Sequence, residues 1–189
     1  PGSRGAGADQ SIVLGAHYDH LGTGWPGALE ANVGQVHPGA DDNASGVSVL
    51  LELASNMSSE GGGSRNLVFV AFSGEEAGLH GSSHYVANPR FPVDGVRGMI
   101  NMDGVGRLFD GEISVHATGT ADEWQHIFRG VGFVTGVTGK NIAERVGGSD
   151  QESFIEVGVP AVQVFTGAHA DYHRPSDTAE RIDSAGLVK

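Results

Sequence analysis

The stretch NLVFVAFSGEEAG, residues 66–78, carries the pattern on which the fold prediction rests. Its first part, Asn66 to Phe72, is a continuous run of apolar and β-branched residues. Such a run predicts a central strand of a sheet that is covered on both faces. Directly after it, a short polar turn carries the adjacent carboxylates Glu75 and Glu76. The rest of the chain repeats this combination of a buried strand and ligand-type side chains near its end.

Strands and helices are predicted to alternate along the chain. Other apolar runs predict strands at residues 12–16, 96–102, 113–117 (nearer an edge) and 160–165. Helical patterns and helix-start signals fall between them, at residues 44–57, 79–87, 121–130, 151–157 and from 182 onward. This order predicts an α/β fold, a three-layer sandwich with a mixed, mostly parallel central β-sheet and helices on both faces.

Two of the predicted helices have further local signals. In the helix at 44–57, an apolar face is expected from residues at helical spacing, namely Val47, Leu50, Leu51 and Ala54. The helix at 151–157 follows the pair Ser149-Asp150, which is a favourable N-cap sequence. Between the elements, residues 22–40 are Gly/Pro-rich and are expected to form a loop, and GGGS at 61–64 a turn or short linker.

Ligand-type side chains lie near the ends of most of these strands. They are His17 in GAHYDH, Asp42 in GADDNASG, Glu75 and Glu76 in SGEEAGLHGS, Asp103 in INMDG and His173 in DYHRPSDT. In open α/β sheets, ligands bind beyond the carboxyl ends of the strands, so residues as far apart as 17 and 173 can meet on one rim. Asp42 precedes a predicted helix, whose backbone dipoles also favour an anion.

Each of these motifs alone has a simpler explanation. Asp42 could only cap a helix, the Glu pair could only begin one, and Asp103 could only form a turn. Together they supply two imidazoles, three ligand carboxylates and a spare carboxylate, which suits two zinc ions with a base beside them. An all-oxygen Mg²⁺ or Ca²⁺ site would not require two histidines, so zinc, or cobalt or manganese in its place, fits better. His20 is expected to lie outside the direct ligands.

Composition limits the other functional classes. The 189 residues predict one domain, and the formal net charge of -12 disfavours nucleic-acid binding. No apolar run is long enough for a membrane helix. The absence of cysteine excludes thiolate zinc sites and disulfides. The polar opening, residues 1–10, has the character of a cut loop rather than a natural start.

In combination, order and spacing, the motifs resemble peptidase family M28, a family of dizinc metallopeptidases that includes bacterial secreted aminopeptidases. They are GAHYDHLG, GADDNASG, GEEAGLHGS, INMDGVG, GGSDQESF, GVPAV and DYHRPSDTAERID, and the resemblance runs from about residue 12 to residue 183. The resemblance implies that residues 1–189 form one catalytic domain that is shortened at its N-terminus. A shortened C-terminus is a further expectation. It also implies a secreted or periplasmic location.

The resemblance further implies a role for each site residue. Asp42 would bridge two Zn²⁺ ions, His17 and Asp103 would bind one of them, and Glu76 and His173 the other. Glu75 would be the general base and Tyr172 the donor to the oxyanion, while Asp19 and Asp177 would support the ligands from outside. The peptide bond after Asp42 would be cis. The family often has Ser-Asp-His where this chain has Ser149-Asp150-Gln151, so no role of that histidine carries over.

The reaction implied by the resemblance is hydrolysis of the first peptide bond of a peptide with a free N-terminus. Related alternatives are a carboxypeptidase, a single-zinc glutaminyl cyclase and a catalytically inactive binding domain. An acidic Ca²⁺-binding module is disfavoured because the chain has no D-x-D-x-D-G loop. The oligomeric state and the preferred substrate side chain are not indicated by the sequence.

Overall fold

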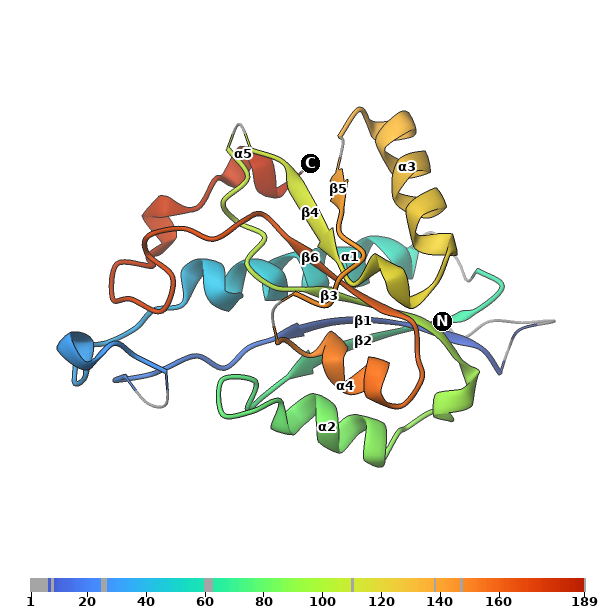
Figure 1. Ribbon diagram of the computed structural model, residues 1–189, viewed down its shortest axis with the longest axis horizontal. Helices are drawn as coiled ribbons and strands as arrows, with labels where there is room; N and C mark the ends of the chain where they lie inside the picture. The colour runs from blue at the N-terminus through green and yellow to red at the C-terminus, as the bar shows by residue number, and fades with distance from the viewer. Residues whose placement is uncertain are drawn as a thin grey trace.

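One β-sheet organises the described part of the chain, which comprises residues 7, 9–24, 27–59, 63–109, 111–137, 139–146 and 148–188 of the computed structural model. Its strand order is β2-β1-β3-β6-β4-β5 (Figure 1). The strands are β1 (Ser11–His17), β2 (Asn66–Phe72), β3 (Val96–Met102), β4 (Ile113–His116), β5 (Gly139–Asn141) and β6 (Ala161–Phe165). All neighbouring pairs are parallel except β4 and β6, which confirms the predicted mixed, mostly parallel sheet.

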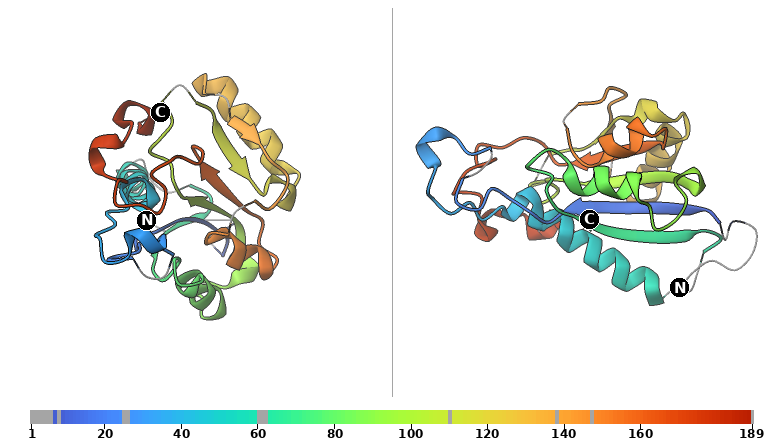
Figure 2. Two further views of the ribbon diagram at one scale, coloured as in Figure 1. Left: turned by 60° about the vertical axis from the view of Figure 1, so that its left-hand side comes forward. Right: turned by 90° about the horizontal axis from the view of Figure 1, so that it is seen from below.

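Helices cover both faces of the sheet. The helices are α1 (Gly46–Ser59), α2 (His80–Ala87), α3 (Glu123–Thr135), α4 (Gln151–Glu156) and α5 (Ser184–Leu187). Successive β1 side chains alternate between the layers: Val13 packs in a cluster with Phe154 of α4, and Leu14 packs with Leu50 of α1. Figure 2 shows α1 on one side of β1 and β2 and α2 and α4 on the other. The three-layer sandwich is therefore confirmed.

The position of β2 differs from the prediction. The run NLVFVAF forms an edge strand that pairs with β1, not a central strand. Its Leu67 and Ala71 side chains are exposed, whereas Phe72 is buried in the cluster beneath α4. The prediction of a central place was wrong because a long apolar run also suits an edge strand that is flanked by helices.

The predicted helix boundaries agree with the structure better than the predicted buried faces of the helices do. In α1, Leu50 is buried and Val47 and Leu53 pack beside it, so that Leu51 lies off this face and is 65% exposed. The expected burial of Leu51 was therefore wrong. In α3 the helix continues through Gly130 and ends where Gly136 adopts a left-handed conformation.

Two other predicted features turned out differently. The short strand β5 was not predicted, because its sequence GKN is polar and only three residues long. The Asp150 side chain makes no cap bond to α4, although the helix begins where expected. Residues 1–6, 8 and 60–62, which include most of the polar opening and part of the GGGS turn, lie outside the described residues. No helix among the described residues is long and apolar enough to cross a membrane.

A tight turn at Ala40–Ser45 joins the loop after β1 to α1. The Asp42–Asn43 peptide bond in it is cis, as the family resemblance implies. Asn43 Nδ2 donates to the Met102 carbonyl at 2.9 Å, and Asn43 Oδ1 accepts from the backbone N–H of Gly46 at 3.1 Å and of Gly104 at 3.3 Å. These bonds tie the start of α1 to the end of β3.

This junction predicts that Gly46→Ala is destabilising. A Cβ atom at residue 46 would lie 2.4 Å from both Asn43 Oδ1 and the Met102 carbonyl oxygen. We expect the free energy of unfolding to fall by about 2 kcal/mol or more, as measured by urea denaturation. The control is Gly130→Ala in α3, where a Cβ meets no atom within 4 Å and should stabilise the helix by about 0.5–1 kcal/mol. Equal stability of Gly46→Ala and wild type would contradict this account of the turn.

Candidate metal centre

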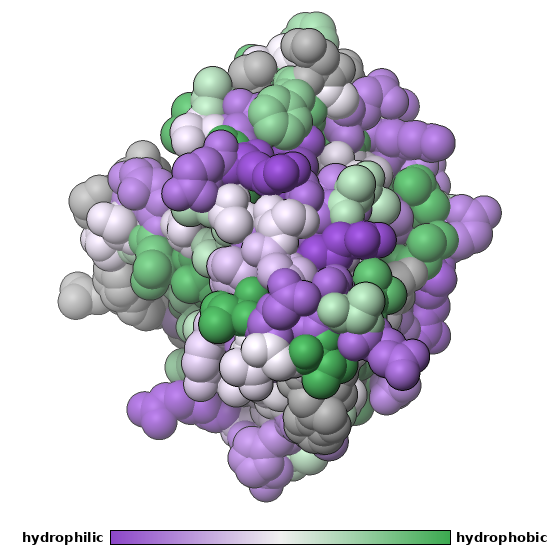
Figure 3. Space-filling view, turned by 90° about the vertical axis from the view of Figure 1, so that its left-hand side faces the viewer, coloured by the Kyte–Doolittle hydropathy of each residue, from purple (hydrophilic) through white to green (hydrophobic). Residues whose placement is uncertain are grey.

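The predicted ligand residues converge at the end of the sheet toward which the strands β1, β3 and β6 point. His17 is the last residue of β1, and Asp103 directly follows β3. Glu76 lies in the loop after β2, His173 in the loop after β6, and Asp42 in the turn before α1. Figure 3 shows the molecule from this side, where hydrophilic residues are interspersed with hydrophobic ones.

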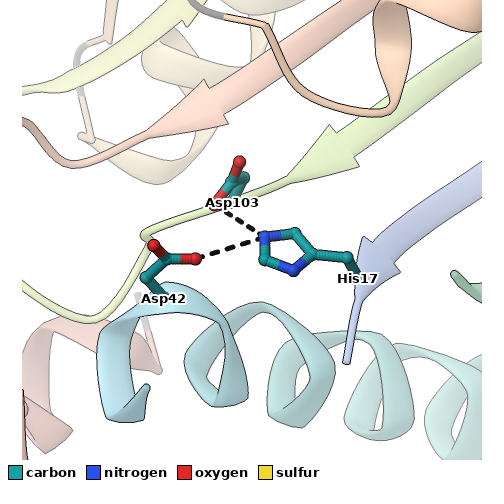
Figure 4. Close-up of side chains that lie close together, drawn as sticks. All are labelled: His17, Asp42 and Asp103. Carbon is teal, nitrogen blue, oxygen red and sulfur yellow. Dashed lines mark hydrogen bonds and ion pairs between the residues drawn. The ribbon is translucent and has the colours of Figure 1, made fainter. Parts of the chain in front are cut away.

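His17 contacts two of the carboxylates (Figure 4). Its Nε2 atom lies 3.3 Å from Asp42 Oδ1 and 3.4 Å from Asp103 Oδ1. Its Nδ1 atom donates to the backbone carbonyl of Asp19 at 3.1 Å, and the ring is only 1% exposed. Because Nδ1 carries the proton for that bond, Nε2 is the nitrogen that is available to a metal ion.

The other oxygen of Asp42 faces a second pair of residues. His173 Nε2 lies 3.1 Å from Asp42 Oδ2 and 3.3 Å from Glu76 Oε2. His20 Nδ1 lies 2.7 Å from Glu76 Oε1 and 3.9 Å from Asp42 Oδ2. Asp42 thus presents one oxygen to each histidine group, as a bridging carboxylate would. His20, which the sequence pattern did not assign to the site, contacts it directly.

Glu75 and Glu76 diverge, although they are adjacent in the sequence. Glu76 contacts the histidines, whereas Glu75 lines a cavity of about 190 Å³ together with Asp42, Asp103 and Tyr172. Tyr172 is 50% exposed, and its ring is stacked on His173 with 3.9 Å between the ring centroids. A substrate in the cavity would therefore meet Glu75 and Tyr172 beside the ligand candidates.

Asp19 and Asp177 support the ligand-bearing segments through the backbone. The Asp19 carboxylate accepts from the backbone N–H groups of Glu75 at 3.2 Å and Glu76 at 3.3 Å. Asp177 Oδ2 accepts from the backbone N–H groups of Asp41 at 2.9 Å and Asp42 at 3.1 Å. The resemblance implies that both residues support the ligands from outside. In the structure their carboxylates hold the backbone of the turns that carry the ligand candidates, rather than the histidine rings.

The donor atoms of the site fit zinc. Two groups, His17/Asp42/Asp103 and His20/Asp42/Glu76, each have ligand atoms within 4.8 Å of one another. Nitrogen and carboxylate donors in such groups are typical zinc ligands. Asp42 Oδ2 is buried beside the imidazoles of His173, at 3.1 Å, and His20, at 3.9 Å, and a buried carboxylate in such a place requires positive charge next to it.

Comparison with known proteins agrees with this geometry, because residues 2–189 match the sequence profile of peptidase family M28. The chain belongs to peptidase family M28. This confirms the resemblance carried by the sequence motifs.

Relatives at 28–29% identity are named aminopeptidases. The chain is 28% identical to aminopeptidase YwaD of Bacillus subtilis, over 93% of this chain and 38% of the relative. It is 29% identical to a probable leucine aminopeptidase of Arthroderma otae, over 96% and 51%. The solved structure of a zinc aminopeptidase from Bacillus subtilis superposes with a TM-score of 0.78 at 28% identity, over 95% and 43%. The chain therefore spans only about two-fifths to one-half of these relatives.

Some residues that shape this M28 site were not found by sequence reasoning. Gln163 lies in the buried strand β6, and its Nε2 donates to Asp103 Oδ2 at 3.5 Å. Arg107 bridges Asp171 and Asp177 with contacts of 3.3 and 2.9 Å. A polar residue within an otherwise apolar strand, such as Gln163 in AVQVF, was a usable signal. Arg107 had no such signal, because its partners are 64 and 70 residues away in sequence.

The metal-free site alters the protonation of its own residues. Burial raises the pKa of Glu75 to about 9, and the nearby acidic groups, led by Asp103, add to the shift. Burial alone would lower the pKa of His17, but its contacts with Asp103 and Asp42 outweigh this and raise the pKa to about 12. The pKa of Asp42 is lowered, because contacts with His17 and His173 outweigh its burial. Protons therefore compensate the charge of the crowded carboxylates when no cation does.

These shifts predict that the metal-free protein loses stability as pH rises. Folded Glu75 keeps its proton up to about pH 9, whereas the unfolded group loses it near pH 4.5. Protonated His17 contributes stability that is complete below pH 6.5 and is lost toward pH 12. Both groups bind more protons in the folded state. The urea concentration at the unfolding midpoint of chelator-treated protein should therefore decrease as the pH is raised from 5 to 9. Glu75→Gln should flatten this slope, and a midpoint that rises with pH would contradict the assignment.

Proposed function

We propose that this chain is the catalytic region of a zinc-dependent aminopeptidase that removes the N-terminal residue from peptides by means of two zinc ions. One observation carries the proposal. In an M28 chain, Asp42 presents its two oxygens to two histidine groups at 3.1–3.3 Å, and the free carboxyl group of Glu75 lines the adjoining cavity. A secreted or periplasmic location, which the family resemblance implies, stays a prediction.

The proposed division of labour among the ligands follows the two groups. Asp42 would bridge, with His17 and Asp103 on one zinc and Glu76 and His173 on the other. Two zinc ions supply Lewis acidity that activates water and the scissile carbonyl. Cobalt or manganese would be possible substitutes.

Glu75 and Tyr172 would carry the proton and charge transfers. The Glu75 carboxylate takes the proton of the attacking water and returns it to the leaving amine. The Tyr172 hydroxyl donates to the oxygen that becomes negative in the transition state. The high pKa of Glu75 belongs to the metal-free protein, and nearby cations favour its ionised form, which the role of a base requires.

The cavity suggests an apolar substrate side chain. Away from the carboxylates, its walls include Val146, Phe165 and Ala168, together with His116. Both His116 nitrogens are already engaged, with the Val146 carbonyl at 3.2 Å and Ser114 Oγ at 3.0 Å. The acidic end can hold the substrate's α-ammonium group, and the apolar end its side chain, which is consistent with the relative named as a probable leucine aminopeptidase.

The alternatives differ in measurable ways. A glutaminyl cyclase of the single-zinc type would bind one zinc per chain, whereas the proposed aminopeptidase binds two. A carboxypeptidase would cleave N-blocked peptides, which the aminopeptidase would leave intact. A catalytically inactive domain is disfavoured because the five ligand candidates and Glu75 are all present at one rim.

Replacement of the base tests the mechanism. Glu75→Gln should retain two zinc ions per chain but lose at least about 100-fold in kcat/KM on aminoacyl-nitroanilides, because the amide cannot accept the proton. Metal analysis and steady-state kinetics on the 189-residue chain measure both effects. Glu123→Gln, on the exposed surface of α3, is the matched control. A Glu75→Gln enzyme with two zincs and normal turnover would remove Glu75 from this role.

Filling the cavity tests the substrate site. Ala168→Phe adds a large side chain to the apolar wall, so kcat/KM for a leucine substrate should fall about tenfold or more. The value for an alanine substrate should stay within about twofold, because its methyl group needs little space. A uniform loss on both substrates would place the side-chain pocket elsewhere.

A further inference from the structure

The carboxylate ligand candidates differ in how their second oxygen is used. In a tetrahedral zinc site with bonds of about 2.0–2.1 Å, two ligand atoms lie about 3.3 Å apart. His17 and Asp103 show this separation at 3.4 Å, and His173 and Glu76 show it at 3.3 Å. One oxygen of Asp103 and one of Glu76 are therefore spaced as ligands.

His20 contacts the other oxygen of Glu76 in a different way. Its Nδ1 atom is 2.7 Å from Glu76 Oε1, which is short for two ligands of one ion but normal for a hydrogen bond. A carboxylate oxygen can only accept, so Nδ1 is the donor. His20 therefore belongs to the group that holds Glu76 rather than to the ligands.

Gln163 holds one oxygen of Asp103 as His20 holds one oxygen of Glu76. It is the last of three side-chain amides that are linked by hydrogen bonds. The Asn101 Nδ2 group donates to Gln151 Oε1 at 3.1 Å, and Gln151 Nε2 donates to Gln163 Oε1 at 3.4 Å. Gln163 is thereby turned so that its Nε2 faces Asp103 Oδ2, at 3.5 Å. Gln151, which stands where the family often has histidine, is a buried member of this chain of bonds.

Asp42 lacks such a donor at the oxygen facing the second group. Its Oδ2 atom is buried and lies 3.1 Å from His173 Nε2, itself a ligand candidate, while Oδ1 faces His17 in the same way. Asp177 supports Asp42 through its backbone N–H and not through its carboxylate. The carboxylate of Asp42 is thus left to use both oxygens.

We propose that His20 and Gln163 are positioning residues that each occupy one oxygen of a terminal carboxylate ligand, Glu76 and Asp103 respectively. Each leaves the other oxygen to a single metal ion, and Asp42 alone is left to bridge. This inference rests on the proposed dizinc function and deepens it, because it assigns one supporting donor to each ion.

The proposal predicts that each variant weakens a different ion. His20→Leu should weaken one zinc by about 10–100-fold, the range found when a donor to a metal ligand is removed, and leave the other unchanged. His20→Asn keeps an N–H near the position of Nδ1 and should recover most of the affinity. Gln163→Met, which keeps the length but loses the donor, should weaken the other zinc. Stepwise titration against a chromophoric chelator measures both affinities, and cobalt absorption at one and two equivalents reports each site.

Double variants assign each donor to its ligand. His20→Leu should add little to the loss caused by Glu76→Ala, because the donor then has nothing to hold, but should add in full to Asp103→Ala. Gln163→Met should show the opposite pattern. The control is His37→Leu, which removes another histidine from the loop after β1, whose Nδ1 bonds to the Gln35 carbonyl. Both zinc affinities of this control should stay within about twofold of wild type.

Several results would overturn the proposal. They are wild-type affinities in His20→Leu, an equal loss at both sites, no recovery in His20→Asn, or the same loss in His37→Leu. If wild-type protein binds no zinc pair, the proposed function fails as well. If wild type binds two zincs and hydrolyses peptides while the His20 and Gln163 variants keep both affinities, only the present inference fails.

Discussion

The site depends on one buried carboxylate between two imidazoles. Asp42 is 3% exposed, and its oxygens lie 3.3 Å from His17 and 3.1 Å from His173. A carboxylate in such a place is stable only when positive charge compensates it. The turn that carries it is held by the Asp177 carboxylate and by the Asn43 side chain, which ties it to the end of β3. The fold therefore holds Asp42 in place, and the other ligand candidates lie around it.

The charges of the site predict that metal binding and stability are coupled. The buried acidic groups raise the pKa of His17 to about 12, and burial raises that of Glu75 to about 9, so that protons occupy the metal-free site. Cations that bind there must displace the His17 proton, and the metal affinity therefore rises with pH. Bound cations would offset both the desolvation of the Glu75 carboxylate and its repulsion by the neighbouring acidic groups. The group that is proposed as the base thus becomes available as a base only when the site is filled.

Sequence could predict the parts of this structure that depend on local pattern. Strand ends such as His17 and Asp103 were found because apolar runs stop abruptly at ligand-type residues. The edge position of β2 and the exposure of Leu51 could not be predicted, because both depend on which element packs alongside. His20 and Gln163 were missed for the same reason: a donor to a ligand is defined by a contact across 56 or 60 residues, and sequence spacing does not record it. The roles of the ligands themselves stay predictions that rest on this geometry and on membership of the family.

Several polar groups around the site are paired with one another or with backbone groups. Arg107 pairs with Asp177 and shares Asp171 with Arg181, so that the Asp177 carboxylate, which holds the Asp41 and Asp42 amides, has a cation beside it. The amides Asn101, Gln151 and Gln163 reach Asp103 without adding any charge at all. A charged donor in their place would compete with a cation for the same carboxylate, whereas a neutral one orients the carboxylate and leaves its charge for the metal. A neutral donor therefore suits a carboxylate that is proposed to bind one ion, as the Gln163 amide does for Asp103.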